Sequence, residues 1–349
     1  MDGLRTEWAY DANGNRTHEN GLPIASYDAQ DRLLTWKDQH YSYSPAGDLK
    51  AKTTAQGPTR YDYDALGNLR QVQLPGGQRI DYDIDPLNRR IGKRKNGQQQ
   101  YRLIYLDELR PLAELDAQGQ LRSLFIYAGQ ANAPTLMLRE GKTWRLIADH
   151  LGSIRLVIDA ETGQIGQRLD YDAWGRITHD SQPGFQPFGF AGGLYDPDTG
   201  LTRFGARDYD AETGRWTAKD PILFNGGDTN LYGYVLQDPV NFVDPEGLQA
   251  LDSPNATLRS AIARGDVDQL KAILEVLNPE QQIIARQAIE KFSSKAADWI
   301  GKYCKGNINR EFPTQLREKT IKEIFDLSKS GNKDAKKAWK LINDSRFKK

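Results

Sequence analysis

A short unit led by tyrosine recurs along the first two thirds of the chain. Its first five copies read YDANGNR, YDAQDRL, YSPAGDL, YDALGNL and YDIDPLNRRI, and they begin at Tyr10, Tyr27, Tyr43, Tyr63 and Tyr82. The nearly constant spacing indicates a tandem array. Each copy joins an aromatic residue to a turn of Asp, Gly, Asn or Pro type, and Gly and Asn accept the positive φ of tight hairpin turns. The array therefore predicts repeated strand, turn and strand units.

The same unit returns as YDAWGRI from Tyr171, YDPDTGL from Tyr195 and YDAETGRW from Tyr209. Beyond Leu248 the composition changes. Residues 1–248 hold 27 basic and 34 acidic side chains, a net charge of −7, whereas residues 249–349 hold 20 and 13, a net charge of +7. All but one of the tyrosines precede this point. The break predicts two domains of different fold type.

The repeats are accompanied by ADHLGSIRLVID (148–159), GLTRFGARDYDAETGRWTAKDP (200–221) and NLYGYVLQDPVNFVDPEGL (230–248). This ordered set resembles the Rhs/YD-repeat core of bacterial polymorphic toxins. The resemblance implies a β-spiral shell, which in family members encloses a C-terminal toxin. The expected fold is multidomain β + α, with a YD-repeat shell fragment at 1–248 and a mainly α-helical toxin domain at 249–349. Such shells usually have many more repeats, so residues 1–248 are expected to form only the closing end of one.

The segment PVNFVDPEGL, which ends at Leu248, is similar to the family's self-cleavage motif. The resemblance implies autoproteolysis after Leu248. Peptide hydrolysis by carboxylates needs two close groups that share one proton, so that the charged one activates water and the protonated one polarises the carbonyl. The candidates are Asp220, Asp238 and Asp244, and the resemblance favours Asp220 with either of the others. The alternative is that each Asp before Pro only starts a turn.

Residues 249–349 show apolar side chains at helical spacing. We expect a helix from Val267 capped by Asp266, and a longer helix that Pro279 opens and that continues to Tyr303. A third helix is expected after a Thr314 cap, and a fourth after Gly331. Residues 249–292 would form a helical lead-in, and 293–349 a basic effector.

The last fifty residues hold 14 Lys or Arg against six acids. This excess predicts a polyanionic partner, above all nucleic acid, although lysine-rich helices can also be plain solvated surface. No histidine follows residue 248, which disfavours zinc deaminases and nucleases that depend on imidazole. A ribonuclease can work without histidine, because the RNA 2′-OH attacks the phosphate once a carboxylate takes its proton and a cation stabilises the anion.

For that chemistry the candidate catalytic residues are Arg310, Glu311, Lys319 and Lys302, and the candidate nucleic-acid contacts are Lys305, Arg317, Lys336, Lys337, Arg346 and Lys348. Two alternatives remain open. One is a DNase that would hold Mg²⁺ through Glu311, Glu318, Glu323 and Asp326, and the other is a noncatalytic adaptor. We expect no metal site or cofactor otherwise. His150 is expected to serve as a structural hydrogen-bonding residue, and the single Cys304 as a small buried thiol.

The partners follow from the resemblance. They are an RNA or DNA substrate, a cognate, acidic immunity protein that charge complementarity would attract, and a secretion apparatus reached through missing upstream regions. The N-terminal residues lack the apolar core of a signal peptide, and no segment has the roughly 18–20 apolar residues that span a bilayer. We therefore expect a protein that is cytoplasmic in its producer, exported without a cleaved signal and delivered into target cells, with no stable membrane insertion.

Overall fold

The computed structural model describes residues 5–128, 132–252, 261–262, 265–274, 279–303 and 312–343. The chain divides into two units, Met1–Ser253 and Pro254–Lys349. The division falls after Ser253 rather than after Leu248, because residues just beyond Leu248 pair with a strand of the first unit. Each unit is described by itself below.

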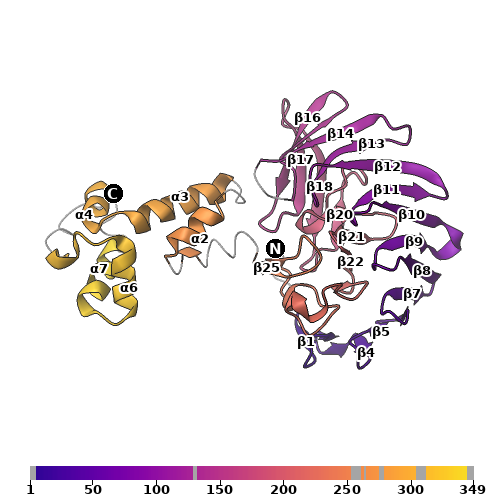
Figure 1. Cartoon of the computed structure of the whole chain (residues 1–349), viewed down its shortest axis with the longest axis horizontal. Helices are drawn as coiled ribbons and strands as arrows, with labels where there is room; N and C mark the ends of the chain where they lie inside the picture. The colour runs from indigo at the N-terminus through magenta and orange to yellow at the C-terminus, as the bar shows by residue number, and fades with distance from the viewer. Residues whose placement is uncertain are drawn as a thin grey trace. The chain divides into compact units, whose positions relative to one another are not determined.

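The first unit is built on one 16-stranded antiparallel sheet in which each strand pairs with the next along the chain. Figure 1 shows this sheet curving around the segment that carries strands β20 to β22. Its strands are β4 (Ala25–Tyr27), β5 (Leu33–Trp36), β6 (Gln39–Tyr43), β7 (Leu49–Thr54), β8 (Gly57–Tyr63), β9 (Leu69–Gln73), β10 (Arg79–Ile84), β11 (Arg90–Lys95), β12 (Gln98–Tyr105), β13 (Pro111–Leu115), β14 (Leu121–Ile126), β15 (Leu136–Arg139), β16 (Lys142–Ala148), β17 (Ile154–Asp159), β18 (Ile165–Tyr171) and β19 (Ile177–Asp180).

The repeated Tyr and Asp each have a distinct role in this sheet. The turn aspartate accepts backbone N–H groups two and four residues later, as Asp172 does from Trp174 and Arg176. The same pattern is found at Asp11, Asp28, Asp64, Asp85, Asp116 and Asp149. In some copies the leading tyrosine hydroxyl donates to the carbonyl of an earlier strand, as Tyr27 does to Arg16 and Tyr171 does to Ile154. One residue thus closes the turn while the other ties neighbouring strands together.

Two of the first five copies of the unit differ from this pattern. In the copy from Tyr43, Ser44 replaces the aspartate, and its Oγ accepts the Asp48 N–H at 3.1 Å. In the copy from Tyr82 the turn is closed by Asp85, while Asp83 forms an ion pair with Arg94 on the neighbouring strand β11. The turn therefore lies later in that copy than its leading Tyr-Asp pair suggests.

Three smaller sheets complete the first unit. They contain β1 (Trp8–Tyr10), β2 (Arg16–Glu19) and β3 (Leu22–Pro23); β20 (Leu194–Tyr195), β21 (Leu201–Phe204), β22 (Arg207–Asp210) and β23 (Arg215–Trp216); and β24 (Phe242–Val243) and β25 (Leu251–Asp252). Short 3₁₀ turns are η1 (Pro75–Gly77), η2 (Phe190–Gly192), η3 (Leu223–Gly226) and η4 (Val235–Gln237). The second of these sheets packs around buried aromatic rings, among them Phe204, Tyr209, Trp216 and Tyr234.

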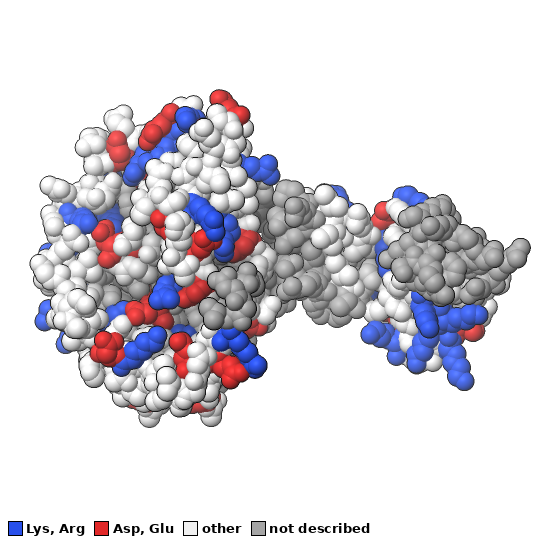
Figure 2. All heavy atoms as spheres, turned by 180° about the vertical axis from the view of Figure 1, so that it is seen from behind, with Lys and Arg blue, Asp and Glu red and all other residues white. Residues whose placement is uncertain are grey.

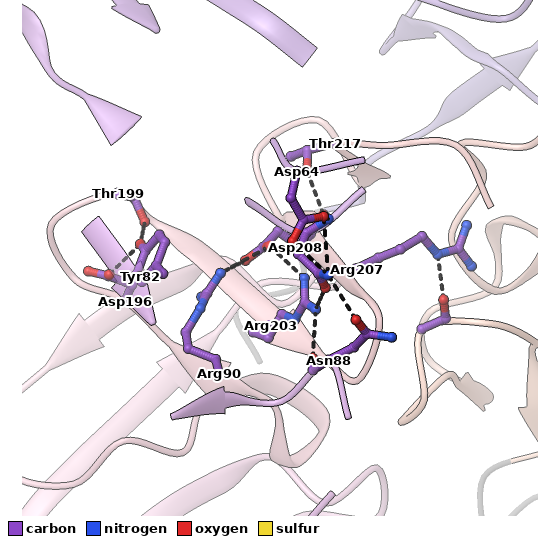
Figure 3. A network of polar contacts seen from close by, with 12 residues as sticks. Asp64, Tyr82, Asn88, Arg90, Asp196, Thr199, Arg203, Arg207, Asp208 and Thr217 are labelled. Atoms are coloured by element: carbon purple, nitrogen blue, oxygen red, sulfur yellow. Dashed lines mark hydrogen bonds and ion pairs between the residues drawn. The ribbon is translucent and has the colours of Figure 1, made fainter. Parts of the chain in front are cut away.

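Buried charges fasten this inner sheet to the curved one. Asp208 accepts from Arg90 of the curved sheet at 2.8 Å and from Arg203 at 3.0 Å, and all three side chains are at most 3% exposed (Figure 3). Asp196 likewise accepts from the Tyr82 hydroxyl and from Lys93. Because a buried carboxylate without its cations would be costly, these pairs fix the position of the inner sheet.

The beginning of the first unit also contacts the far end of its curved sheet. The Arg16 guanidinium lies over the ring of Trp36 at 4.6 Å and over that of Trp174 at 4.0 Å, and Trp8 packs edge-on against Trp174. Arg16 also donates to the Thr213 carbonyl of the inner sheet. These contacts join the two ends of the sheet around the inner segment.

The described part of the second unit is helical, with a core of Ala, Leu, Ile and Phe side chains. Its elements are α2 (Val267–Ala272), α3 (Pro279–Ser293), α4 (Ala296–Tyr303), η5 (Thr314–Leu316), α6 (Ile321–Lys329) and α7 (Lys333–Asn343). Asp266 caps α2 as predicted. No helix in the described ranges is long and apolar enough to cross a membrane.

Two helix predictions for this unit are wrong in detail. The single long helix expected from Pro279 to Tyr303 is broken between α3 and α4, where the N–H of Ala296 donates to the Lys319 carbonyl instead of continuing the helical pattern. The third helix is capped by Thr320 in a capping box with Glu323, not by Thr314, which begins only the short turn η5.

Candidate active site around Asp220 and Asp244

The Leu248–Gln249 peptide bond lies in the loop between the paired strands β24 and β25. Asp244 begins this loop, and its Oδ1 accepts the N–H of Leu248 at 2.9 Å and that of Gln249 at 3.1 Å. The bond at which cleavage is predicted is therefore fixed in two ways. The Asp244 carboxylate accepts the N–H groups of both residues of the bond, and the pairing of β24 with β25 holds the two ends of the loop together. The bond lies inside the first unit rather than in a linker.

Asp220 reaches the same place from a different segment, just before η3. Its Oδ2 lies 2.9 Å from Nη2 of Arg207, and the same nitrogen lies 3.3 Å from Oδ2 of Asp244. Arg207 also donates through Nε to the Gly247 carbonyl, next to Leu248. One guanidinium thus joins both carboxylates to the loop that carries the bond. Asp220, Asp244 and Arg207 are 6%, 2% and 3% exposed.

The charges of this cluster favour a shared proton. Burial raises the pKa of Asp244 to about 6, against the lowering effect of Arg207, and the nearby Asp220 raises it further. Burial also raises the pKa of Asp220. Two buried carboxyls face a single guanidinium, so the pair holding one proton leaves the site with no net charge, and the doubly ionised pair does not.

A cavity of about 180 Å³ opens at this cluster, lined in part by Arg207, Asp220, Asp244, Leu248 and Gln249. Such a volume exceeds that of several water molecules, and its polar lining offers the partners that a buried water needs. One wall is formed by η4, where Val235, Leu236 and Gln237 have φ of 44°, 54° and 64°. Three successive left-handed residues without glycine are strained.

Asp238, the third candidate, is not brought to this cluster. Both of its carboxylate oxygens accept from the side chain of Asn241, at 3.0 and 2.9 Å, and it does not line the cavity. It has the turn-forming role that the sequence offered as the alternative. A ring nitrogen of His150 lies 2.9 Å from the Val240 carbonyl in the same stretch, which is a structural contact of the expected kind.

Sequence reasoning did not single out Arg207. It stands within GLTRFGARDYD among many arginines, and nothing in its local pattern separates it from Arg203, which instead pairs with Asp208. The only general expectation that could have led to Arg207 is that a buried pair of acids needs a cation nearby.

Of the residues predicted to act in the basic effector, Arg310, Glu311, Lys305, Arg346 and Lys348 lie outside the described residues, as does Cys304. Lys302, near the end of α4, forms an ion pair with Glu290, which raises the pKa of Lys302. Lys319 lies 3.6 Å from Glu323, and its carbonyl meets the start of α4. Lys302 and Lys319 are thus placed at opposite ends of that helix.

The acids considered as Mg²⁺ ligands are engaged with lysines or backbone where the structure describes them. Glu318 pairs with Lys295, Asp326 pairs with Lys322, and Glu323 closes the Thr320 cap. Within the described ranges no group of three or more His, Cys, Asp or Glu could hold a metal ion.

Helix α7 has a face of a different kind. Lys333, Lys336, Lys337 and Lys340 are not buried and share one side of the helix, opposite its buried residues. None of the four forms an ion pair with a described residue. In contrast, Lys319, just before the cap of α6, and Lys322, in its first turn, each pair with an acid four residues later. Figure 2 shows basic side chains gathered on the described surface of this unit. We call these four residues the α7 lysine face.

Comparison with known proteins identifies the first unit. Residues 1–240 match the family model described as the Teneurin YD-shell. The chain belongs to the YD-shell family. It is 31% identical over 253 residues to teneurin-3 of Danio rerio, covering 66% of this chain and 9% of that protein. It is 30% identical over 281 residues to double-stranded DNA deaminase toxin A of Burkholderia cenocepacia, covering 71% of this chain and 20% of the toxin.

Among solved structures, the TcdB2–TccC3 complex matches at 19% identity and a TM-score of 0.43, covering 70% of this chain and 17% of that one. The Tc holotoxin pore of Photorhabdus luminescens with a mutated TccC3 matches at 17% identity and a TM-score of 0.44, with the same coverage. The chain thus spans a fifth or less of the length of each of these four relatives. It is an Rhs-type YD-shell protein related to bacterial toxins.

Proposed function

We propose that this chain is a self-cleaving toxin shell, which cuts its own backbone after Leu248 with Asp220 and Asp244. The observation that carries the proposal is the convergence of two buried carboxyls and Arg207 on the Leu248–Gln249 bond. Turn formation alone would explain one aspartate before a proline. It would not explain two carboxyls from separate segments that share one guanidinium beside a peptide bond.

The chemistry balances with one proton shared by the pair, and the reacting arrangement is the one in which Asp220 holds that proton and Asp244 is ionised. A water molecule in the cavity attacks the Leu248 carbonyl carbon, and the ionised Asp244 takes the water proton. Asp220 gives its proton to the carbonyl oxygen, and it regains that proton as the tetrahedral intermediate collapses. The C–N bond breaks, and Asp244, 3.1 Å from the Gln249 nitrogen, passes its proton to that leaving nitrogen. The products are a carboxyl group on Leu248 and an amine on Gln249.

The test compares three variants of the full chain. Asp220→Asn and Asp244→Asn should leave a single chain, whereas Asp238→Asn should still give two products with masses that correspond to 1–248 and 249–349. Asp238→Asn is a matched control because Asp238 is also an Asp before Pro in the same region. Products from Asp244→Asn at the wild-type rate, or a break elsewhere in the wild type, would reject the proposal.

We further propose that residues 249–349 are the toxin cargo and act on RNA without histidine. The α7 lysine face supports this, because four lysines without described acidic partners offer a surface for phosphates. The same face would receive an acidic immunity protein. Arg310 and Glu311 remain the proposed catalytic pair, with delivery through a secretion apparatus into a competing cell.

Two measurements test the cargo. Replacing Lys336 and Lys337 by Glu should weaken RNA binding and reduce its salt dependence, whereas Lys322→Glu on α6, whose lysine already pairs with Asp326, should have a smaller effect. Expression of the full chain in cells, with Arg310→Ala and Glu311→Ala beside the wild type, followed by sequencing of RNA ends, tests cleavage. Intact RNA in cells that make the wild-type chain would argue against a ribonuclease.

A further inference from the structure

Gly226, the last residue of η3, lies where the acid and the bond meet. A Cβ added to Gly226 would stand 2.7 Å from Oδ2 of Asp220 and 2.7 Å from the Leu248 carbonyl oxygen. Contacts this short are essentially never made by real side chains. The carboxyl oxygen and the carbonyl oxygen are therefore no more than twice that distance apart, and both lie against the bare Cα of Gly226.

The backbone conformation at position 226 does not require a glycine. The φ of Gly226 is outside the left-handed region, so alanine could adopt it. Its neighbour Gly227 is the opposite case. Gly227 has a φ of +85° and forms the left-handed cap of η3, yet a Cβ there would meet no described atom within 4 Å. The turn therefore requires glycine at position 227, whereas at position 226 the close approach of the Asp220 and Leu248 oxygen atoms requires it.

Neither neighbouring atom can move away easily. The Asp220 carboxyl is held by Arg207 through Oδ2 and by the Ile222 N–H through Oδ1. The Leu248 carbonyl belongs to a backbone segment that Asp244 holds in place, because the Asp244 carboxylate accepts the N–H groups of both Leu248 and Gln249. A methyl group at position 226 would therefore push the acid and the carbonyl apart.

We propose that Gly226 is a positioning residue for self-cleavage, whose missing side chain lets Asp220 approach the Leu248 carbonyl. The inference rests on the proposed function of Asp220 and Asp244. Displacement of a reacting group by about 1 Å can cost about a hundredfold in rate. Gly226→Ala should accordingly slow cleavage of the full chain by about 30- to 100-fold, while Gly227→Ala should cleave at close to the wild-type rate.

The two alanine variants form a matched pair with different expectations for the cleavage rate. Gly227→Ala forces a side chain into a left-handed conformation and should lower the melting temperature, but its Cβ would meet no described atom within 4 Å, so Asp220 and the Leu248 carbonyl keep their positions. If cleavage instead follows stability, so that Gly227→Ala is the slower variant, the proposal is overturned. It is also overturned if Gly226→Ala cleaves as fast as the wild type.

A double-mutant cycle gives a reading that needs no cleavage. Asp220→Gly removes one of the two atoms that the new methyl group would meet. The drop in melting temperature caused by Gly226→Ala should therefore be smaller in the Asp220→Gly background, whereas the drop caused by Gly227→Ala should be the same in both backgrounds. Equal effects in both backgrounds would contradict the contact. A wild-type chain that never cleaves would reject the proposed function, while a coupling seen in this cycle would still establish the contact.

Discussion

Self-cleavage should depend on pH through the proton that Asp220 and Asp244 share. The structure raises the pKa of Asp244 to about 6, chiefly by burial, and that of Asp220 in the same direction. The reaction needs one carboxyl protonated and one ionised. As pH rises through about 6 the pair loses its last proton, so the rate should fall about tenfold for each further unit. At pH 8 cleavage should be about a hundredfold slower than on the plateau below about 6, and a second decline is expected at lower pH where both carboxyls hold a proton.

The assay starts from unfolded, uncut chain recovered in urea and diluted into buffers from about pH 4.5 to about 8.5, a range that brackets the carboxyl pair. Intact mass follows the appearance of the two products, and circular dichroism follows refolding in the same samples, so that slow folding is not mistaken for slow cleavage. Asp238→Asn should reproduce the wild-type profile, because Asp238 pairs with Asn241 away from the cavity. A rate that is level from about pH 6 to about 8, or that increases over this range, would refute the shared-proton mechanism.

Three further predictions concern stability in other parts of the molecule. Asp208→Asn leaves the buried Arg90 and Arg203 without their anion and should lower the free energy of unfolding by about 3–5 kcal/mol, measured by urea titration; a loss below about 1 kcal/mol would contradict the fastening role of this pair. Leu236→Gly relieves a left-handed residue whose side chain is 55% exposed and should raise the melting temperature, with a gain of about 1 kcal/mol, whereas Val240→Gly, where φ is not positive, should lower it. Thr320→Ala removes the capping box of α6 and should cost about 1 kcal/mol, whereas Thr314→Ala, at the cap expected from the sequence, should cost less in the same thermal melt.

The sequence was informative wherever one residue type has one local role. The Tyr and Asp of each repeat predicted the strands and turns, because an aspartate that accepts two nearby N–H groups closes its turn without help from distant residues. The two exceptions keep this chemistry, because Ser44 accepts an N–H in place of an aspartate and Asp85 closes its turn from a later position in the copy. The break between α3 and α4 was not predictable in this way, because the carbonyl that meets Ala296 belongs to Lys319, far along the chain.

The candidate site shows the same limit more sharply. Asp220, Asp238 and Asp244 have similar local sequences, each an Asp followed by Pro, and only the tertiary structure separates them. Asp238 turns back to Asn241, three residues away, whereas Asp220 and Asp244 meet through Arg207, which lies on a strand of the inner sheet. The contribution of Gly226 is equally invisible in sequence, since Gly226-Gly227 resembles any other turn.

The position of the bond relative to the domain boundary was also beyond the sequence. Charge and composition change after Leu248, so the predicted scissile bond coincided with the predicted boundary between two domains. The pairing of Phe242 with Asp252 and of Val243 with Leu251 puts that bond within a hairpin loop of the first unit instead. A ladder of two residue pairs is too short to leave a periodic pattern, yet it holds the segment beyond Gln249 in place. The peptide is therefore fixed on both sides before any reaction, which is the arrangement that brings a reacting bond to its catalytic groups without the entropy cost of capturing a free substrate.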